Sequence, residues 1–307
     1  MSAIFARELA RFGPDRPYRS PPLPAAREYC RRLALTHYEN FSVASLFVPR
    51  RLHRHFHNVY AFCRWADDLG DETGGGAESL RLLNWWRKEL LRGYDGRPRH
   101  PVMIALSETI QKFQIPPTPF LELISAFEQD QTVRRYQICE QLLDYCRRSA
   151  NPVGRLVLYL AESFDSRRTA LADHLCTALQ LTNFWQDLAR DYAIGRVYLP
   201  AEDCRRFGYS EADLQARRFT PSFVELMRFE VNRTREMFHW GIKLIELMPG
   251  DLQTQTELFV RGGLAILKKI EVQGFDVWRR RPKLSRLEKA LLVIAAAGRK
   301  WKRSRSA

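Results

Sequence analysis

The sequence predicts an all-helical protein, organised as one domain around a central cavity with polar walls. Apolar residues recur at helical spacing through almost the whole chain, and few alternating β-branched runs compete with this pattern. Glycine and proline clusters divide the helical stretches. Hydrophobic residues make up 45% of the 307 residues, which is enough for a large core.

The first half of the chain is expected to hold seven helices, each ending where helix breakers occur. Breaks are predicted at Gly74–Gly76, Asp95–Pro98 and Pro116–Pro117, because glycine and proline disfavour helix interiors. The predicted helices are 25–35, 51–69, 77–94, 101–113, 119–128, 139–150 and 153–164.

The second half is expected to hold five helices with the same kind of boundary. Gly195 and Pro249–Gly250 mark the breaks. The predicted helices are 166–192, 210–216, 221–247, 253–273 and 285–297. Residues 26–298 would therefore form the helical domain, preceded by an irregular tail at 1–25 that holds five prolines and followed by a basic tail at 299–307.

Composition points to a cytoplasmic protein. No apolar stretch near the N-terminus is long enough for a secretory signal, and the longest wholly apolar run, 290–297, is far shorter than the ~20 residues of a membrane span. Six cysteines lie in helical segments without metal-binding spacing, so they are expected to be buried free thiols in a reducing compartment. They are Cys30, Cys63, Cys139, Cys146, Cys176 and Cys204.

Two aspartate pairs carry the functional signal. Asp67 and Asp71 have the same i, i+4 spacing as Asp187 and Asp191, which lie 120 residues further along. On a helix, each pair projects two carboxylates from one face. Two such helices turned toward each other would hold hard divalent cations and, through them, a diphosphate.

Each pair belongs to a longer polar stripe. Tyr60 and Arg64 extend the first stripe backward, and Gln180 and Asn183 extend the second. Large apolar residues border both stripes, which is unlike a solvated helix face and indicates an interior cavity. The alternative is a solvent-facing run in which Arg190 and Arg196 neutralise the second pair. Repetition of the pattern favours the cavity.

Four segments of the sequence resemble those of a known family. YAFCRWADDLGDE and QLTNFWQDLARDYAIGRVYLP look like the two aspartate-rich motifs of the squalene and phytoene synthases. HYENFSVASLFVP and YCRRSANPVG are similar to two further segments of that family. The resemblance covers about Tyr29 to Pro282, and it implies an isoprenoid synthase fold, a prenyl diphosphate substrate and Mg²⁺.

The resemblance also implies residue roles. It makes the carboxylates at positions 67, 71, 187 and 191 the catalytic magnesium-binding groups, with Tyr145 near the leaving group. The implied metal ligands are Asp67, Asp68, Asp71, Asn183, Asp187 and Asp191. The implied substrate contacts are His37, Phe41, Tyr60, Arg64, Gln180, Asn183, Arg196 and Tyr198. From the residues alone, Arg196 could instead be a cation that satisfies carbonyls at a helix end.

The chain departs from the common family pattern at three positions. Gln186 stands where a cation is usual, Arg190 stands where an acid is usual, and Asn40 replaces a common serine. This combination looks most like the hydroxysqualene synthases of bacterial hopanoid pathways, which act on presqualene diphosphate. The loss of a cation at Gln186 is expected to suit an enzyme that ionises one diphosphate rather than binding two.

The expected reaction is a magnesium-dependent lyase reaction. Diphosphate would leave presqualene diphosphate, and water would capture the rearranged carbocation to give hydroxysqualene without NADPH. Phe41, Tyr60, Phe184 and Trp185 are candidates for the wall that shields the cation, although the last two could be core residues. The alternatives are a prenyltransferase that condenses two prenyl diphosphates head to head, and a non-catalytic assembly protein of the same fold.

The net charge of +14 is concentrated at the C-terminus. Residues 279–307 contain eleven Lys or Arg and one acid, Glu288. This pattern suits either a peripheral contact with anionic lipid at the inner face of the membrane or a solvated end with one packed helix. A nucleic-acid partner is not expected, because few aromatic residues accompany the charges.

Overall fold

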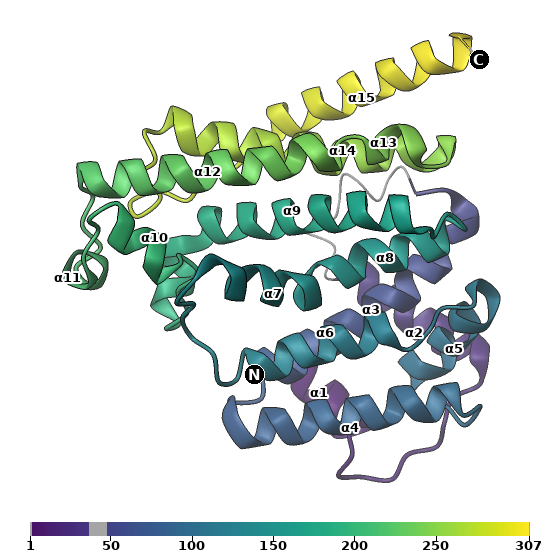
Figure 1. Cartoon of the computed structure of the whole chain (residues 1–307). Coiled ribbons are helices and arrows are strands. Elements are labelled where there is room, and N and C mark those ends of the chain that lie inside the picture. Colours follow the sequence, from purple (N-terminus) through teal and green to yellow (C-terminus); the bar gives the residue numbers. More distant parts are fainter. Residues whose placement is uncertain (1, 37–47, 307) are drawn as a thin grey trace. The chain divides into compact units, whose positions relative to one another are not determined.

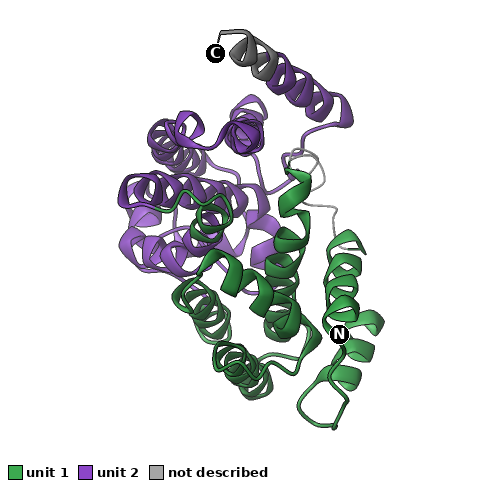
Figure 2. Cartoon of the chain, turned by 90° about the vertical axis from the view of Figure 1, so that its right-hand side faces the viewer, with its two compact units in different colours: residues 1–42, 48–133, 155–164 green, residues 43–47, 134–154, 165–307 purple. Residues whose placement is uncertain are grey.

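The computed structural model describes residues 2–36 and 48–306, with side chains up to residue 298. The fold within these residues is helical, as predicted (Figure 1). An isolated β-bridge between Arg135 and Val197 is the sole strand-like pairing among the residues that the structure describes. The described chain divides into two compact units, which Figure 2 shows in green and purple.

Unit 1 comprises residues 1–42, 48–133 and 155–164. Its helices pack around α3, which contacts α2, α4, α5 and α6. The elements are α1 (Ala3–Phe12), α2 (Leu23–Thr36), η3 (Arg50–Leu52), α3 (His53–Asp71), α4 (Gly76–Tyr94), α5 (Pro101–Phe113), α6 (Thr118–Gln129) and the second half of α8 (Asn151–Leu160).

A cluster of aromatic rings forms the core of unit 1. Trp65 of α3 stacks on Trp86 of α4 at 5.3 Å between ring centroids, and His100 meets Trp65 edge-on with ring centroids 4.5 Å apart. His100 is completely buried, and burial holds its pKa well below the usual range. Its neutral ring can therefore accept a hydrogen bond from the backbone N–H of Val102, which caps α5. This cluster fixes α3, the helix of the first motif.

Unit 2 comprises residues 43–47, 134–154 and 165–307. Its longest helix, α9, packs against α7, α12, α13 and α14. The elements are α7 (Cys139–Ser149), the start of α8, α9 (Ser166–Ala193), α10 (Ala201–Arg206), α11 (Glu211–Gln215), α12 (Pro221–Gly241), α13 (Leu244–Leu247), α14 (Gly250–Val272) and α15 (Arg286–Ser306).

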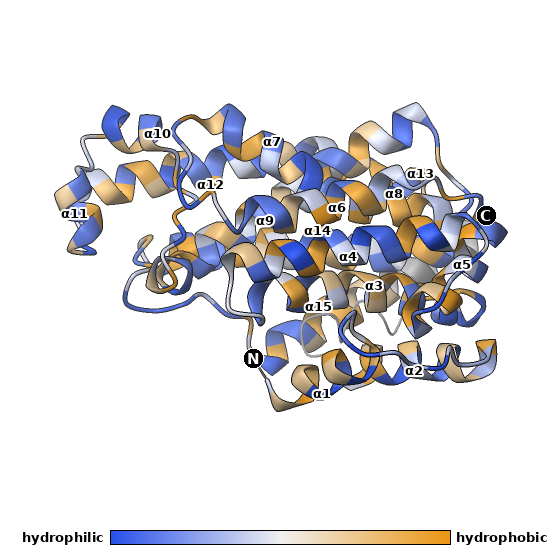
Figure 3. Ribbon diagram, turned by 90° about the horizontal axis from the view of Figure 1, so that it is seen from below, coloured by the Kyte–Doolittle hydropathy of each residue, from blue (hydrophilic) through white to orange (hydrophobic). Residues whose placement is uncertain are grey.

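The close packing of α9 and α12 requires a glycine. A Cβ atom at Gly241 would lie 2.9 Å from both Cα and Cβ of Leu175, so no larger residue fits without moving the backbone of α9. Helices in Figure 3 carry both hydrophobic and hydrophilic residues around their circumference, as the helical spacing of apolar residues in the sequence predicts. Close packing against α12 thus fixes the position of α9, the helix that carries the second motif.

Several predicted boundaries were wrong. Residues 3–12 form α1 rather than an irregular tail, because the prolines of that region all follow residue 13 and Phe5 and Phe12 are buried on one face. The single helix predicted at 221–247 is broken after Gly241. The last helix continues past 297 to Ser306, and α10 is absent from the predicted helices. The proposed limits of the helical domain stay a prediction.

None of the helices in the described part of the chain is both long and apolar enough to cross a membrane.

Candidate active site

The first aspartate motif occupies the last two turns of α3. Arg64 lies one turn before it and pairs with both neighbouring carboxylates: its Nη1 is 3.2 Å from Oδ2 of Asp67, and its Nε donates to Oδ2 of Asp68 at 3.0 Å. Asp68 is buried, and burial raises its pKa to about 7 even though Arg64 opposes the shift. Tyr60, one turn earlier, is half-buried on the same face. Arg64 and Asp67 of the predicted first stripe are thus in contact, whereas Asp71, the last residue of α3, is exposed. The role of the stripe as a metal site stays a prediction.

Glu72 joins this cluster, although no sequence pattern selects it. Its Oε1 lies 3.5 Å from Nη2 of Arg64, and its Oε2 accepts a hydrogen bond from the backbone N–H of Ser2. One guanidinium therefore faces three carboxylates, at positions 67, 68 and 72. This end of α3 carries more negative than positive charge, so it would attract a cation.

The second motif lies near the C-terminal end of α9. Asp187 is bound by the guanidinium of Arg281, whose Nη2 donates to Oδ2 at 2.8 Å and whose Nε contacts Oδ1. Asp191, one turn later, has a pKa raised to about 7 by burial and by the charge of Asp187, while Arg196, Arg190 and Arg281 act in the opposite direction. Asp187 and Asp191 thus place two carboxylates close together on one face of α9.

Arg281 is a site residue that the sequence analysis missed. It lies in the segment between α14 and α15, 94 residues from Asp187. It is the last residue of the run Arg279–Arg281 and directly precedes Pro282. The guanidinium forms a two-bonded, half-buried pair, which is the strong geometry for arginine and carboxylate. The proline-terminated arginine run was the one sequence signal that could have indicated it.

Gln186 explains how this segment is held. Its side chain is buried, and its Nε2 donates to the backbone carbonyl of Pro282. The amide is therefore a structural tie between α9 and the residue that follows Arg281. Two arginines lie near Asp187: Arg281 binds it, and the exposed Arg190 lies 3.6 Å from it.

Arg196 follows α9 after Gly195. Its backbone N–H donates to the carbonyl of Asp191 at 2.8 Å and so satisfies one carbonyl at that end of the helix. The charge of Arg196 lowers the pKa of Asp191. The guanidinium of Arg196 therefore acts on the second motif, and its contact with a diphosphate stays a prediction.

Four aromatic rings gather beside the second motif. Tyr198 stacks on Phe184 with ring centroids 3.7 Å apart, and Tyr145 and Tyr136 lie about 6 Å from Tyr198. All four are buried. Tyr145 of α7 and Tyr198 were both selected from the sequence, and the structure brings them together on one side of α9.

A hollow of about 200 Å³ opens beside Asn183. Apart from Asn183 and Thr182 its walls are apolar or glycine, and they come from α9, α14 and the segment before α15. The lining residues are Leu179, Thr182, Asn183, Leu258, Phe259, Gly262, Gly263, Ile266 and Leu284. Asn183, one turn before Asp187, gives the hollow a polar end at the second motif.

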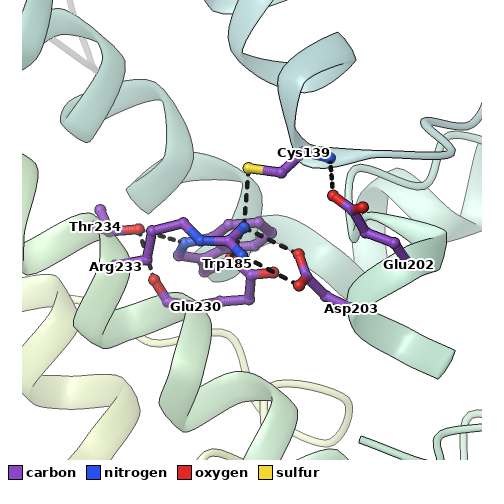
Figure 4. A network of polar contacts seen from close by, with 7 residues as sticks. All are labelled: Cys139, Trp185, Glu202, Asp203, Glu230, Arg233 and Thr234. Atoms are coloured by element: carbon purple, nitrogen blue, oxygen red, sulfur yellow. Dashed lines mark hydrogen bonds and ion pairs between the residues drawn. The ribbon is translucent and has the colours of Figure 1, made fainter. Parts of the chain in front are cut away.

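A buried polar network supports α9 from its other side (Figure 4). The indole of Trp185 is completely buried and donates to Oγ1 of Thr234, so this ring is core rather than cavity wall. Arg233 donates to both oxygens of Asp203, to Glu230 and to the sulfur of Cys139. Glu230 is completely buried, and burial raises its pKa to about 8.

The donor set fits a hard divalent cation in part. Each motif offers two carboxylates one turn apart, and Mg²⁺ is commonly held by one or two carboxylates together with waters and substrate phosphates. Among the residues that the structure describes, no three His, Cys, Asp or Glu side chains converge on one point. Because α3 belongs to unit 1 and α9 to unit 2, the meeting of both motifs around one cavity stays a prediction. His37 and Phe41 lie outside the described residues.

Comparisons with known proteins cover almost the whole chain. The profile of the squalene/phytoene synthase family matches residues 34–288. The phytoene synthase of Thermus thermophilus is 32% identical, over 86% of this chain and 90% of its own length, and that of Arthrospira platensis is 28% identical, over 84% and 89%. The chain spans most of the length of these relatives.

Solved structures agree with this result. The crystal structure of squalene synthase HpnC from Alicyclobacillus acidocaldarius is 46% identical, with a TM-score of 0.80 over 82% of this chain and 95% of that one. A dehydrosqualene synthase in complex with ligand is 25% identical, with a TM-score of 0.81 over 90% and 96%. These likenesses confirm the all-helical, single-domain isoprenoid synthase fold. The chain is an enzyme of the squalene/phytoene synthase family.

Proposed function

We propose that this enzyme converts presqualene diphosphate and water to hydroxysqualene and diphosphate, as a magnesium-dependent step of squalene and hopanoid biosynthesis in the cytoplasm. The observation that carries the proposal is the 46% identity to squalene synthase HpnC over 95% of that chain, against 25–32% for the phytoene synthases. The two aspartate motifs, both complete in this chain, supply the groups that such a reaction needs.

Magnesium ions would be held by the carboxylates of the two motifs. Asp67, Asp68 and Asp71 are the ligands on α3, and Asp187, Asp191 and Asn183 are the ligands on α9. When bound, the metal would supply charge stabilisation for the leaving diphosphate. Arg281 holds Asp187 in the structure, so binding of a metal at Asp187 has to share or displace that guanidinium.

The protein's own cations and donors act on the same leaving group. Departure of diphosphate breaks its C–O bond and leaves both electrons on the diphosphate oxygen. Arg64, Arg196 and Arg281 offer guanidinium groups that bind such oxygens in pairs. Gln180 is half-buried one turn before Asn183 and is the amide that we assign to the outer edge of this contact. Donors fixed before ionisation stabilise the developing charge most effectively.

The carbocation left behind needs an apolar surface and one admitted water. The hollow beside Asn183 supplies an apolar wall for a prenyl chain, with its polar end toward Asp187. Tyr145 and Tyr198 present aromatic faces next to α9, which can stabilise a passing cation. Water adds its oxygen to the rearranged cation and releases one proton, so the balanced products are hydroxysqualene, diphosphate and a proton. No reductant enters this balance.

A second function, head-to-head condensation of two prenyl diphosphates, is favoured by the phytoene synthase relatives. The two functions separate in one assay. Purified enzyme with Mg²⁺ is incubated separately with presqualene diphosphate, farnesyl diphosphate and geranylgeranyl diphosphate, and products are identified by mass spectrometry. Hydroxysqualene from presqualene diphosphate supports the proposal, whereas efficient coupling of farnesyl or geranylgeranyl diphosphate would replace it with the second function.

A further inference from the structure

The C-terminal helix α15 has two apolar faces, of which one is packed. Ala296 is completely buried, and Leu292 and Val293 are half-buried where α15 contacts α14. On the other face Leu287, Leu291 and Ile294 are 69%, 54% and 66% exposed. Their spacing of four and three residues places them in one stripe along the helix. Figure 1 shows this helix in yellow, running along α14 at its start and extending beyond it.

The charges around this stripe are almost all positive. Arg286, about 100° around the helix from Leu287, is exposed, and Lys289 is exposed on the opposite side of the helix. Glu288, the sole acid from 279 to 307, is already neutralised: Lys269 lies 2.7 Å from its Oε1, and the backbone N–H of Ser285 donates to its Oε2. The remaining turns of α15, from 299 to 306, add five Lys or Arg in sequence. The stripe is therefore set in a basic helix whose acid is occupied.

We propose that α15 lies on the surface of a lipid bilayer that contains anionic headgroups, with Leu287, Leu291 and Ile294 entering the boundary between headgroups and acyl chains. An apolar stripe flanked by cations suits that boundary, because the side chains enter the apolar layer while the charges pair with lipid phosphates. The surface of a protein partner fits less well, since the buried centre of protein interfaces is depleted in lysine.

Stacking on the bases of a single-stranded nucleic acid would need exposed aromatic rings. Trp278, next to this segment, is already packed, with its ring 5.7 Å from Tyr192 and 5.7 Å from Phe223. The longest apolar run of the helix is also too short for a span. The lipid surface is thus the partner whose chemistry matches both the stripe and the charge, and this inference does not depend on the proposed reaction.

Vesicle co-sedimentation of the full chain tests the proposal. One set of vesicles contains equal parts of phosphatidylglycerol and phosphatidylcholine, and the other contains phosphatidylcholine alone. The variants are Leu291→Asp, Ile294→Asp and the triple variant Lys300→Gln, Lys302→Gln, Arg303→Gln. Ile4→Asp is the matched control, because Ile4 lies on α1 and is exposed to the same 54% as Leu291.

The expected result is binding to the anionic vesicles that weakens with salt and is much lower on phosphatidylcholine. Leu291→Asp and Ile294→Asp should each lower the partition coefficient by about 10-fold or more, while Ile4→Asp leaves it unchanged. The triple variant should also lower it and should reduce the salt dependence. Thermal unfolding of each variant shows that the fold is retained, as expected for exposed positions.

Three results would overturn the proposal. The first is no binding of the parent protein to anionic vesicles. The second is equal binding of Leu291→Asp and the parent. The third is a parent dimer in light scattering that Leu291→Asp converts to a monomer without any change in vesicle binding, because the stripe would then be an interface between two copies of this chain.

Discussion

Two adjacent glycines of α14 should respond oppositely to the same substitution. A Cβ atom at Gly263 would lie 2.4 Å from Cζ of Phe238 and 3.0 Å from Cδ2 of Leu179, whereas a Cβ atom at Gly262 would meet nothing within 4 Å. Phe238 is 1% exposed, so its ring has no free space to enter. The two positions share a helix and a residue type, and they differ in the space available to an added side chain.

The magnitudes follow from two opposing terms. Alanine is favoured over glycine inside a helix by about 1 kcal/mol, which applies at both positions. Overpacking in a filled core costs about 1–3 kcal/mol, and the 2.4 Å approach to Phe238 places Gly263→Ala at the upper end. We therefore expect Gly262→Ala to stabilise the enzyme by about 1 kcal/mol and Gly263→Ala to destabilise it by about 2 kcal/mol.

Urea unfolding of the two variants beside the parent measures this difference directly, through the midpoint at an unchanged slope. A shift of both midpoints in the same direction, or a neutral Gly263→Ala, would refute the close contact between Gly263 of α14 and Phe238 of α12. Gly262 also lines the hollow beside Asn183. The bulkier change Gly262→Leu should therefore keep the fold yet raise KM for the prenyl substrate by about 10-fold or more.

Three further predictions concern the motifs and their support. Asp67→Asn and Asp187→Asn should each abolish turnover while circular dichroism shows an intact fold, since each removes a metal ligand but little volume; comparable activity at saturating magnesium contradicts the metal assignment. Gln186→Arg should retain some turnover of presqualene diphosphate without gaining efficient farnesyl diphosphate condensation, and it should lower stability because the bond to the Pro282 carbonyl is lost. Glu230 has a folded-state pKa raised from 4.5 to about 8, so its favourable contribution is complete below pH ~4.5 and is lost as pH rises through about 8. Between pH 5 and 9 the free energy of unfolding of the parent should fall by an amount on the order of 3 kcal/mol more than that of Glu230→Gln, which has no carboxyl to ionise. An identical pH dependence in parent and variant contradicts the buried-carboxyl interpretation.

Much of the fold followed from helical periodicity and from the positions of glycine and proline. The helix predicted at 101–113 coincides with α5, because Pro101 and the following residues form a strong N-terminal signal. The break after Gly241 was not predicted, because no proline and no run of glycines marks it in the sequence. The helix α1 was missed because the prolines that follow it dominated the composition of the tail.

In the candidate site, too, relations within one helix could be predicted, whereas tertiary contacts could not. Spacing alone placed Arg64 with Asp67, and Asn183 one turn before Asp187, because those relations lie within one helix. Arg281 was missed, since its pairing with Asp187 depends on how the segment between α14 and α15 returns to α9. Gln186 was selected for its missing charge, whereas its buried bond to Pro282 is a tertiary contact that no local pattern reveals.

The central claim is tested most directly by the source of the product oxygen. Presqualene diphosphate is incubated with enzyme and Mg²⁺ in ¹⁸O-labelled water, without any nicotinamide cofactor, and the product is analysed by mass spectrometry. The proposed mechanism predicts hydroxysqualene that carries one ¹⁸O atom. An absolute requirement for NADPH, with unlabelled hydrocarbon as the product, would contradict it.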